Sequence, residues 1–278
     1  MIRGEYIMDI GVITRLVEGK NTFEEVKKFN LKVCQLVNWN PSLWRDDIAA
    51  QVLRDMKSTG IRVCGLWAGY TGPSKWNFTE GPSTLGLTPK EYRASRVAEL
   101  KLAADFAAKT KIPAIITHAG FLPENMTDTE YLPVLDAIKD IGAHCKKLGV
   151  AFWFETGQET PVTLLRFIEE SGLDNLGINL DPANLILYGK GNPIDSLDVF
   201  GKYVKNVHAK DGVYPTDGRN LGKETPIGAG KVRFPEFIKR LKEIGYTGEL
   251  IIEREISGSQ KDDDIKKSIG DLTTWIHA

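Results

Sequence analysis

The chain has 278 residues, with 36 Lys and Arg against 37 Asp and Glu and a formal net charge of −1. This balance gives no basic surface for nucleic acid or an anionic membrane, and no run approaches the roughly 18 apolar residues of a membrane helix. The length and the hydrophobic content of 42% suit one α/β barrel, which typically takes about 250 residues, or two small domains.

Short apolar runs alternate along the chain with helix-like segments. The runs expected to form strands are Ile10–Thr14, Val33–Asn38, Ile61–Trp67, Ala114–His118, Val150–Glu155, Leu176–Asp181, Val204–His208 and Leu250–Glu253. The segments expected to form helices are Thr22–Phe29, Ser42–Ser58, Pro89–Lys109, Asp128–Leu148, Pro161–Ser171, Phe234–Ile244 and Lys261–Trp275. Near-continuous apolar strands are typical of a parallel sheet that is covered on both faces.

The alternation continues without a linker, and glycines lie where several helices would end, at Gly60, Gly149, Gly172 and Gly245. We therefore expect one α/β domain over residues 1–278, a single (β/α)8 TIM barrel, with an open doubly wound sheet as the alternative. The active site of such a barrel lies at the carboxyl ends of its strands. Two long connections at that end, residues 68–88 and 212–233, are either lids or specificity loops, or mobile decoration.

Four successive strands in the second half of the chain end in a residue that can bind a divalent metal. The segments VAFWFE, LGINLD, VKNVH and GELIIE end in Glu155, Asp181, His208 and Glu253. An ionised group at the end of a buried strand is costly unless it is paired or metal-bound. One such acid could belong to a structural ion pair, but four ligands in succession predict one metal centre where the strands converge.

Three carboxylates and one imidazole form a mostly oxygen-donor site that suits one Mn²⁺, Mg²⁺, Co²⁺ or Zn²⁺ ion. Open positions could hold the hydroxyl and carbonyl groups of a sugar, whose carbonyl the metal would polarise, so that an enediolate is stabilised. Glu155 and Glu253 come from strands that are well separated around the ring. One of them could remove a proton beside the carbonyl, and the other could return it on the opposite face.

Side chains near other strand ends are candidates for substrate binding. His118 could orient a hydroxyl or relay a proton, and Lys210 could meet an anionic or hydroxyl group. Trp67 and Trp39 could form an apolar wall against a sugar ring. The structural alternatives are a buried histidine, an exposed lysine, and tryptophans that only pack in the core or at the rim.

Four segments carry a family resemblance: FWFETG (Phe152–Gly157), NLDPANLILYG (Asn179–Gly189), VHAKD (Val207–Asp211), and Pro226–Glu255 with its G-x-G element, amphipathic helix and GY-x-G turn. They resemble the xylose isomerase-like TIM barrels, specifically the sugar phosphate isomerase/epimerase group that includes D-tagatose 3-epimerase. The resemblance implies that Glu155 and Glu253 are metal ligands and acid/base groups, and that Asp181 and His208 are metal ligands. It also implies a homo-oligomer, a dimer or tetramer.

The chain departs from this group at two positions. Family epimerases often carry D-x-x-H after strand six, and here Asn184 takes the place of the histidine. Asn184 can exchange hydrogen bonds with a substrate but cannot carry a proton. Some epimerases place an arginine six residues past the metal histidine, where this chain has Tyr214, so their sugar recognition does not carry over.

Three other functions remain open. A dehydratase on the same barrel, acting on an inosose or a dehydroshikimate-like substrate, would abstract a similar proton and then expel a hydroxyl. A non-catalytic relative would only bind a sugar. Phosphodiester hydrolysis of the endonuclease IV type needs a trinuclear zinc cluster with many histidines, and this chain has only His118, His144, His208 and His277. The expected partner is a small-molecule sugar or sugar phosphate, with no nucleic acid and no membrane.

The cysteines Cys34, Cys64 and Cys145 are odd in number and widely spaced, and they form no zinc or disulfide motif. We expect the first two to be buried in strands. No secretory signal is visible in the first residues, MIRGEYIMDIGVI. A reducing, cytoplasmic location is therefore expected.

Overall fold

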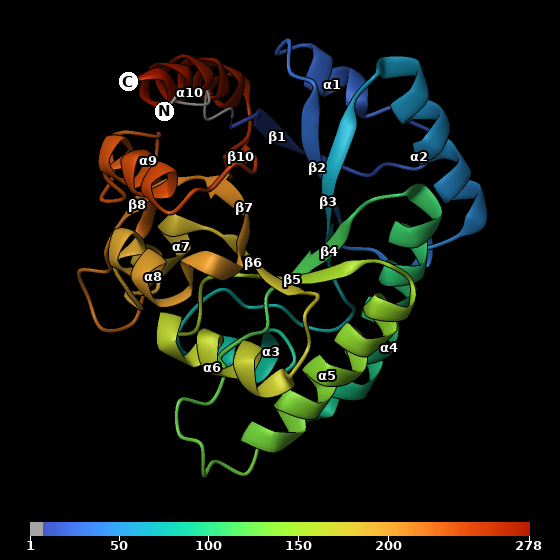
Figure 1. Ribbon diagram of the computed structural model, residues 1–278, viewed down its shortest axis with the longest axis vertical. Coiled ribbons are helices and arrows are strands. Elements are labelled where there is room, and N and C mark those ends of the chain that lie inside the picture. The colour runs from blue at the N-terminus through green and yellow to red at the C-terminus, as the bar shows by residue number, and fades with distance from the viewer. Residues whose placement is uncertain (1–7) are drawn as a thin grey trace.

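The centre of the computed structural model, which describes residues 8–278, is a closed ring of parallel strands in the order β1-β10-β7-β6-β5-β4-β3-β2 (Figure 1). The strands are β1 (Ile10–Arg15), β2 (Val33–Asn38), β3 (Arg62–Ala68), β4 (Ala114–Thr117), β5 (Ala151–Glu155), β6 (Leu176–Leu180), β7 (Val204–Ala209) and β10 (Leu250–Ile252). The closed ring confirms the (β/α)8 barrel and excludes the open sheet. The first seven residues, on which the expectation about a secretory signal partly rests, lie outside the described residues.

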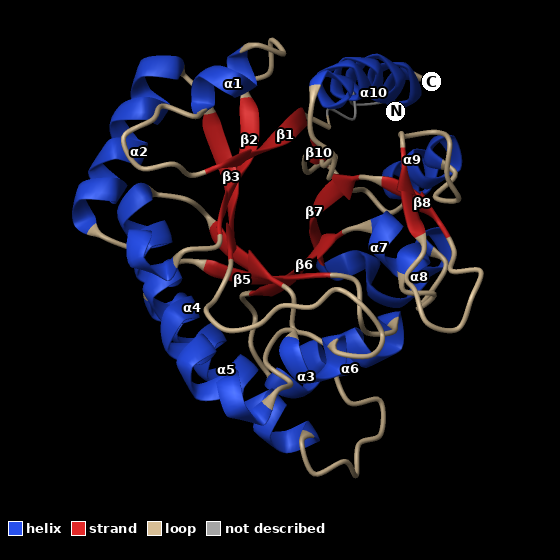
Figure 2. Ribbon diagram, turned by 180° about the vertical axis from the view of Figure 1, so that it is seen from behind, coloured by secondary structure: helices blue, strands red, loops and turns tan. Residues whose placement is uncertain are grey.

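Helices surround the ring on its outside, as Figure 2 shows. They are α1 (Phe23–Lys27), α2 (Asp46–Thr59), α3 (Gly81–Thr84), α4 (Lys90–Thr110), α5 (Tyr131–Lys147), α6 (Pro161–Ser171), α7 (Pro182–Leu187), α8 (Pro193–Phe200), α9 (Phe234–Glu243) and α10 (Ser259–His277). None of these helices combines the length and the apolar character that crossing a membrane would take. The glycine predictions are confirmed at Gly60 and Gly172, which end α2 and α6 in the left-handed conformation. Gly149 and Gly245 also have positive φ, but they lie one residue beyond Leu148 and Ile244, the residues that cap α5 and α9.

The alternation of side chains along each strand decides which residues reach the inside of the barrel. In β5, Phe152 and Phe154 pack in the large core between strands and helices, so Glu155 points into the ring. In β10, Ile252 packs outward in the same core, and Glu253 after it points inward. The strand pattern therefore aims the predicted ligands at the barrel axis.

Several elements were not predicted from the sequence. The segment between β6 and β7 forms α7 and α8, and the connection after β7 contains a two-stranded antiparallel sheet, β8 (Asp211–Val213) with β9 (Lys223–Thr225). Every residue of α7 is buried, so the helix has no polar face and no amphipathic period by which to recognise it. The helix expected over Ser42–Ser58 is a short 3-10 turn, Pro41–Leu43, followed by α2.

The connection after β3 is anchored by a buried arginine of α4. The guanidinium group of Arg96 donates hydrogen bonds to the carbonyl oxygens of Gly86 (2.7 Å), Pro73 (3.0 Å) and Thr71 (3.4 Å). The same group stacks on the ring of Tyr70, 4.1 Å from its centroid. These contacts tie the connection to α4 at both of its ends.

The connection after β7 is anchored by a buried carboxylate. Asp211 accepts hydrogen bonds from the backbone N–H groups of Gly212 (2.8 Å), Gly228, Gly230 and Val232 (3.0 Å each). A Cβ atom at Gly230 would collide with this carboxylate, which explains the glycine there. The N–H groups of the G-x-G element thus bind a carboxylate of the chain itself.

We expect Asp211→Asn to lower the free energy of unfolding by about 2–3 kcal/mol, because an amide nitrogen would then face backbone N–H groups that are left unsatisfied. Denaturant unfolding measures this loss. The control is Asp217→Asn in the same connection, where the exposed carboxylate accepts from Arg219 and Asn220 and little more than about 0.5 kcal/mol is expected. Equal losses in both variants would contradict the anchoring role.

Candidate metal centre

The four predicted ligands meet at the carboxyl ends of four strands that are neighbours in the ring. Glu155 ends β5, Asp181 follows β6, His208 lies in β7, and Glu253 follows β10. One potential ligand atom of each residue lies within 4.8 Å of those of the other three. Over residues 8–278, no other group of three or more His, Cys, Asp or Glu side chains is placed to hold a metal ion.

The imidazole of His208 lies at the centre of this group. Its Nδ1 atom is 3.1 Å from Oε1 of Glu155, 3.2 Å from Oε2 of Glu253 and 3.9 Å from Oδ2 of Asp181. The Nζ atom of Lys210 is 3.2 Å from the same oxygen of Glu253 and 3.6 Å from that of Asp181. Two basic side chains therefore face the buried carboxylates of Glu155 and Asp181 and the partly exposed carboxylate of Glu253.

The charges of this group depend on one another. Burial raises the pKa of Glu155, but the imidazoles of His118 and His208 outweigh burial and lower this pKa below the usual range. Burial likewise raises the pKa of Glu253, and there the ammonium group of Lys210 and the imidazole of His208 lower the pKa below the usual range. Burial dominates at Asp181 and raises its pKa, although Lys210 opposes the shift. Burial would lower the pKa of His208, but the carboxylates of Glu155 and Glu253 raise it well above its usual value.

The residues fit a divalent metal. Oδ1 of Asp181 accepts the backbone N–H of Asn184 at 2.8 Å, whereas its buried Oδ2 atom has no hydrogen-bond partner among the described residues. A buried carboxylate oxygen without a partner is costly, and this one faces the other three ligands. Three carboxylates and one imidazole are a donor set that hard and borderline divalent ions accept.

A pocket of about 750 Å³ is lined by two of the four candidate ligands, Glu155 and Glu253. One of its walls is aromatic: the ring centroids of Trp39 and Trp67 are 4.5 Å apart, and those of Trp76 and His118 are 5.1 Å apart. The lining also includes charged groups, among them Arg15, Lys210, Glu253, Arg254 and Glu255. Glu253 is the most exposed of the four candidate ligands, with 18% of its side chain accessible, and it lines this pocket.

The residues predicted to bind substrate all line this pocket: Trp39, Trp67, His118, Asn184 and Lys210. Several of them also hold Glu155: Asn184 Nδ2 donates to its Oε1 (3.3 Å), the indole N–H of Trp67 donates to its Oε2, and His118 Nε2 lies 3.5 Å from Oε2. The exposed-lysine alternative for Lys210 is wrong, because its side chain is only 3% exposed.

Sequence reasoning missed Trp76 and Tyr188 in the pocket lining. Trp76 lies in the irregular connection after β3, where no period shows which way a side chain points. Its only signal was an aromatic residue in a Gly- and Pro-rich segment next to a strand end. Arg254 lines the pocket but is paired with Glu224 (2.7 Å) and Asp264 (2.8 Å).

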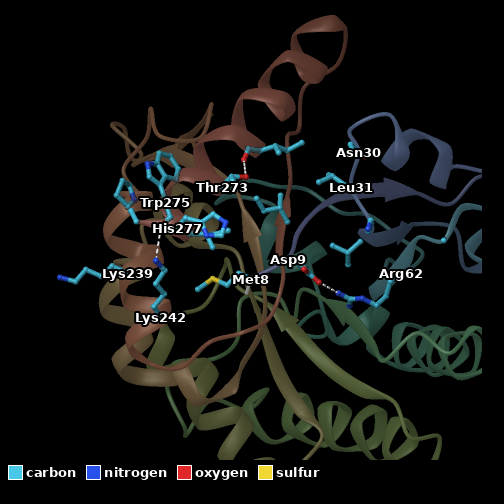
Figure 3. Close-up of a pocket in the computed structure, with 18 residues that line it drawn as sticks. Met8, Asp9, Asn30, Leu31, Arg62, Lys239, Lys242, Thr273, Trp275 and His277 are labelled. Carbon is cyan, nitrogen blue, oxygen red and sulfur yellow. Dashed lines mark hydrogen bonds and ion pairs between the residues drawn. The ribbon is translucent and has the colours of Figure 1, made fainter. Parts of the chain in front are cut away.

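A larger hollow, of about 1550 Å³, lies at the opposite, amino-terminal end of the strands (Figure 3). It is lined by Asp9 and Arg62, which form an ion pair of 2.9 Å, and by residues of α9 and α10 such as Lys242 and His277. None of the four candidate ligands lies there. His144 pairs with Asp105 at 2.9 Å between α5 and α4, so two of the four histidines lie away from the candidate centre.

One further acid is buried without a charged partner in contact. Glu159, in the turn after β5, is 2% exposed, and neither of its carboxyl oxygens has a hydrogen-bond partner among the described residues. Burial raises its pKa to about 8, despite the opposing effect of nearby backbone N–H groups and of Lys190. Glu159 is not among the residues that line the pocket.

Comparisons with known proteins match the barrel fold. A family model described as xylose isomerase-like TIM barrel matches residues 23–275. The solved structure of a xylose isomerase domain protein from Planctomyces limnophilus is 36% identical, covers 97% of each chain and superposes with a TM-score of 0.91. A D-tagatose 3-epimerase-like protein, 21% identical over 96% of this chain and 97% of that one, shares the fold with a TM-score of 0.73.

Curated relatives match over part of their length. An uncharacterized protein of Methanocaldococcus jannaschii is 27% identical over 168 residues, which is 55% of each chain. An inosose dehydratase of Lacticaseibacillus casei is 24% identical over 201 residues, which is 61% of this chain and 66% of that protein. The chain therefore covers less than two thirds of either relative.

We expect Mn²⁺ to stabilise the protein, because the four ligands converge only in the folded chain. At a concentration of 100 times Kd the gain is about 2.7 kcal/mol, which thermal unfolding in a metal titration detects. Asp181→Asn should abolish most of the gain, whereas Glu255→Gln at the pocket rim should keep it. A gain that survives in Asp181→Asn would contradict this site.

Glu159 should make the fold less stable as the pH rises. The folded state holds its proton up to about pH 8, whereas the unfolded chain releases it at the ordinary value of 4.5. Between these values the folded state binds more protons, so the free energy of unfolding declines with increasing pH. Glu159→Gln should flatten this decline in denaturant unfolding at pH 5 and pH 8, and Glu91→Gln on the surface should not. An unchanged slope in Glu159→Gln would refute the prediction.

Proposed function

Because the chain belongs to the family of xylose isomerase-like TIM barrels, we propose that it is a divalent-metal-dependent isomerase or epimerase of a sugar or sugar phosphate. The observation that carries this proposal is the convergence of Glu155, Asp181, His208 and Glu253 beside a pocket. These four residues would hold the ion. When bound, a divalent ion would polarise the substrate carbonyl and stabilise the negative charge of an enediolate.

Glu253 is the first candidate for the base. Its pKa is held low by Lys210 and His208 against the effect of burial, so it is a carboxylate at neutral pH. It is also the ligand with the largest access to the pocket. It can therefore take a proton from a carbon next to the substrate carbonyl.

Glu155 is the second acid/base candidate. Its Oε1 accepts from Asn184 and its Oε2 from Trp67, so the carboxylate is held in one orientation from the side of β5. Once Glu155 has taken up a proton through His118, whose Nε2 lies 3.5 Å from its Oε2, return of that proton from this side would invert the carbon if Glu253 removed the proton from the other. Return to the neighbouring carbon would isomerise the sugar.

The aromatic wall and Lys210 would bind the rest of the substrate. Trp39 and Trp67 present apolar surface that can cover the C–H face of a sugar and exclude water. Lys210 can donate to a hydroxyl, carbonyl or phosphate oxygen, since its pKa is well above the usual value: burial would lower it, but Glu253 and Glu255 raise it. The dimer or tetramer implied by the family resemblance is part of this proposal.

A dehydratase is the second candidate, and the similarity to an inosose dehydratase supports it. The same carboxylates would remove the α-proton, and the ammonium group of Lys210, 3.2 Å from Glu253, could protonate the departing hydroxyl. Mass analysis of the product separates the two functions, because only a dehydratase releases water.

The test of the proposed function is exchange of solvent deuterium into ketoses, ketose phosphates and inososes by the Mn²⁺-loaded protein. We expect deuterium at a carbon next to the carbonyl, and a loss of at least about 100-fold in rate in Glu155→Gln and Glu253→Gln. The matched control is Glu255→Gln, whose carboxylate pairs with Lys210 at 2.8 Å but is not one of the four ligands.

Unchanged exchange in Glu253→Gln would remove that residue from the mechanism. A metal-loaded protein that binds a sugar tightly, without exchange or product on any substrate, would favour the non-catalytic sugar-binding relative.

A further inference from the structure

A column of polar side chains crosses the interior of the barrel below the candidate metal centre. Gln35 of β2, Asn179 of β6 and Asn206 of β7 are fully buried, and the Gln35 amide donates to Asn179 Oδ1 (3.2 Å) and Asn206 Oδ1 (3.4 Å). β2 lies across the ring from β6 and β7, so these contacts run through the barrel. Buried amides cost about 1–3 kcal/mol each unless they are hydrogen-bonded, and the neighbouring inward positions of β2 hold Val33 and Val37.

The hydrogen bonds of this column have a fixed direction. The column starts at Glu249, which pairs with Arg62 at 2.5 Å. The carboxylate of Glu249 can accept hydrogen bonds but cannot donate them. Asn206 Nδ2 donates to Glu249 Oε2 at 3.1 Å, so Asn206 Oδ1 must face Gln35. Gln35 Nε2 then points to that oxygen, and Gln35 Oε1 faces His208 Nε2 at 2.8 Å. The Nε2 atom of His208 must therefore carry a hydrogen.

Asn179 cannot set this direction. Its Nδ2 atom has no partner among the described residues, so its amide can turn together with that of Gln35. The direction is set by the hydrogen bonds from Gln35 through Asn206, because they end at the carboxylate of Glu249, which cannot donate a hydrogen bond. At its far end the column reaches Arg62, which lines the hollow of Figure 3, on the other side of the barrel from the pocket.

We propose that Glu249 and Asn206 are positioning residues that act through Gln35 to hold His208 in the tautomer with hydrogen on Nε2. The lone pair of Nδ1 is then free for the divalent ion, at the atom that faces all three carboxylates. A turned Gln35 amide would point its NH₂ group at Nε2 and favour hydrogen on Nδ1, where it blocks the ion. This inference rests on the metal centre of the proposed function.

The test is the affinity for Zn²⁺, measured by titration calorimetry on the purified full chain. Asn206→Leu and Glu249→Leu both break the column without touching His208, and we expect binding to weaken about 10- to 100-fold in each. The control is Asp9→Asn, which removes the other partner of Arg62 outside the column and should change the affinity less than about twofold.

A rescue separates positioning from a merely structural role. Gln35→Glu in the Asn206→Leu background supplies an oxygen that can only accept from Nε2, so Zn²⁺ affinity should recover although the column stays broken. Histidine ¹⁵N spectra of the Zn²⁺-loaded protein should show hydrogen on Nε2 of His208 in the wild type and in the rescued variant. If the Asn206→Leu variant does not fold, Gln35→Glu is combined with Glu249→Leu instead, because the side chain of Glu249 is partly exposed and its replacement disturbs the core less.

Wild-type binding with unchanged affinity in both column variants, or weakened binding that Gln35→Glu does not restore, would overturn the inference and leave the metal centre standing. No Zn²⁺ binding by the wild type would instead overturn the metal centre, and this inference with it.

Discussion

The three carboxylates around the imidazole of His208 need positive charge beside them, and this requirement shapes the carboxyl-terminal end of the barrel. Glu155, Asp181 and Glu253 place oxygens within 4.8 Å of one another and of His208. Like charges this close repel strongly in a medium of low dielectric constant. The fold tolerates them because His208 and Lys210 supply positive charge among them, and a divalent ion would supply more.

The barrel meets this constraint through its geometry. Each candidate ligand comes from a different strand. Successive side chains of a strand point to opposite faces, so the ligand side chain points into the ring while the residue before it packs in the outer core. The strands β5, β6, β7 and β10 are successive neighbours in the curved sheet, so residues almost a hundred positions apart share one site. The connections around the site are held by buried charges of their own, Arg96 after β3 and Asp211 after β7.

The strands and the four ligand positions could be predicted because their signals are local. A buried strand that ends in an acid is visible in six consecutive residues, and the same pattern recurs in the second half of the chain. The roles in catalysis and metal binding stay predictions, since position alone does not assign them.

Other features depend on long-range contacts that no local pattern reveals. α7 is buried on every side, so it lacks the amphipathic period of a helix. In the sequence, Gln35 is an isolated polar residue in an apolar strand. Its hydrogen-bond partners Asn179 and His208 lie on strands across the barrel, so no local pattern indicates them. Trp76 belongs to an irregular connection whose path is set by contacts such as those of Arg96.

The proposed metal centre can be tested by a crystal structure of the protein soaked in Mn²⁺, with diffraction data collected at the manganese absorption edge. We predict one anomalous peak per chain, in contact with Oδ2 of Asp181, Nδ1 of His208 and the carboxylates of Glu155 and Glu253. A peak at any other place, or none at a concentration that saturates binding in solution, would show that these four residues do not form the metal centre.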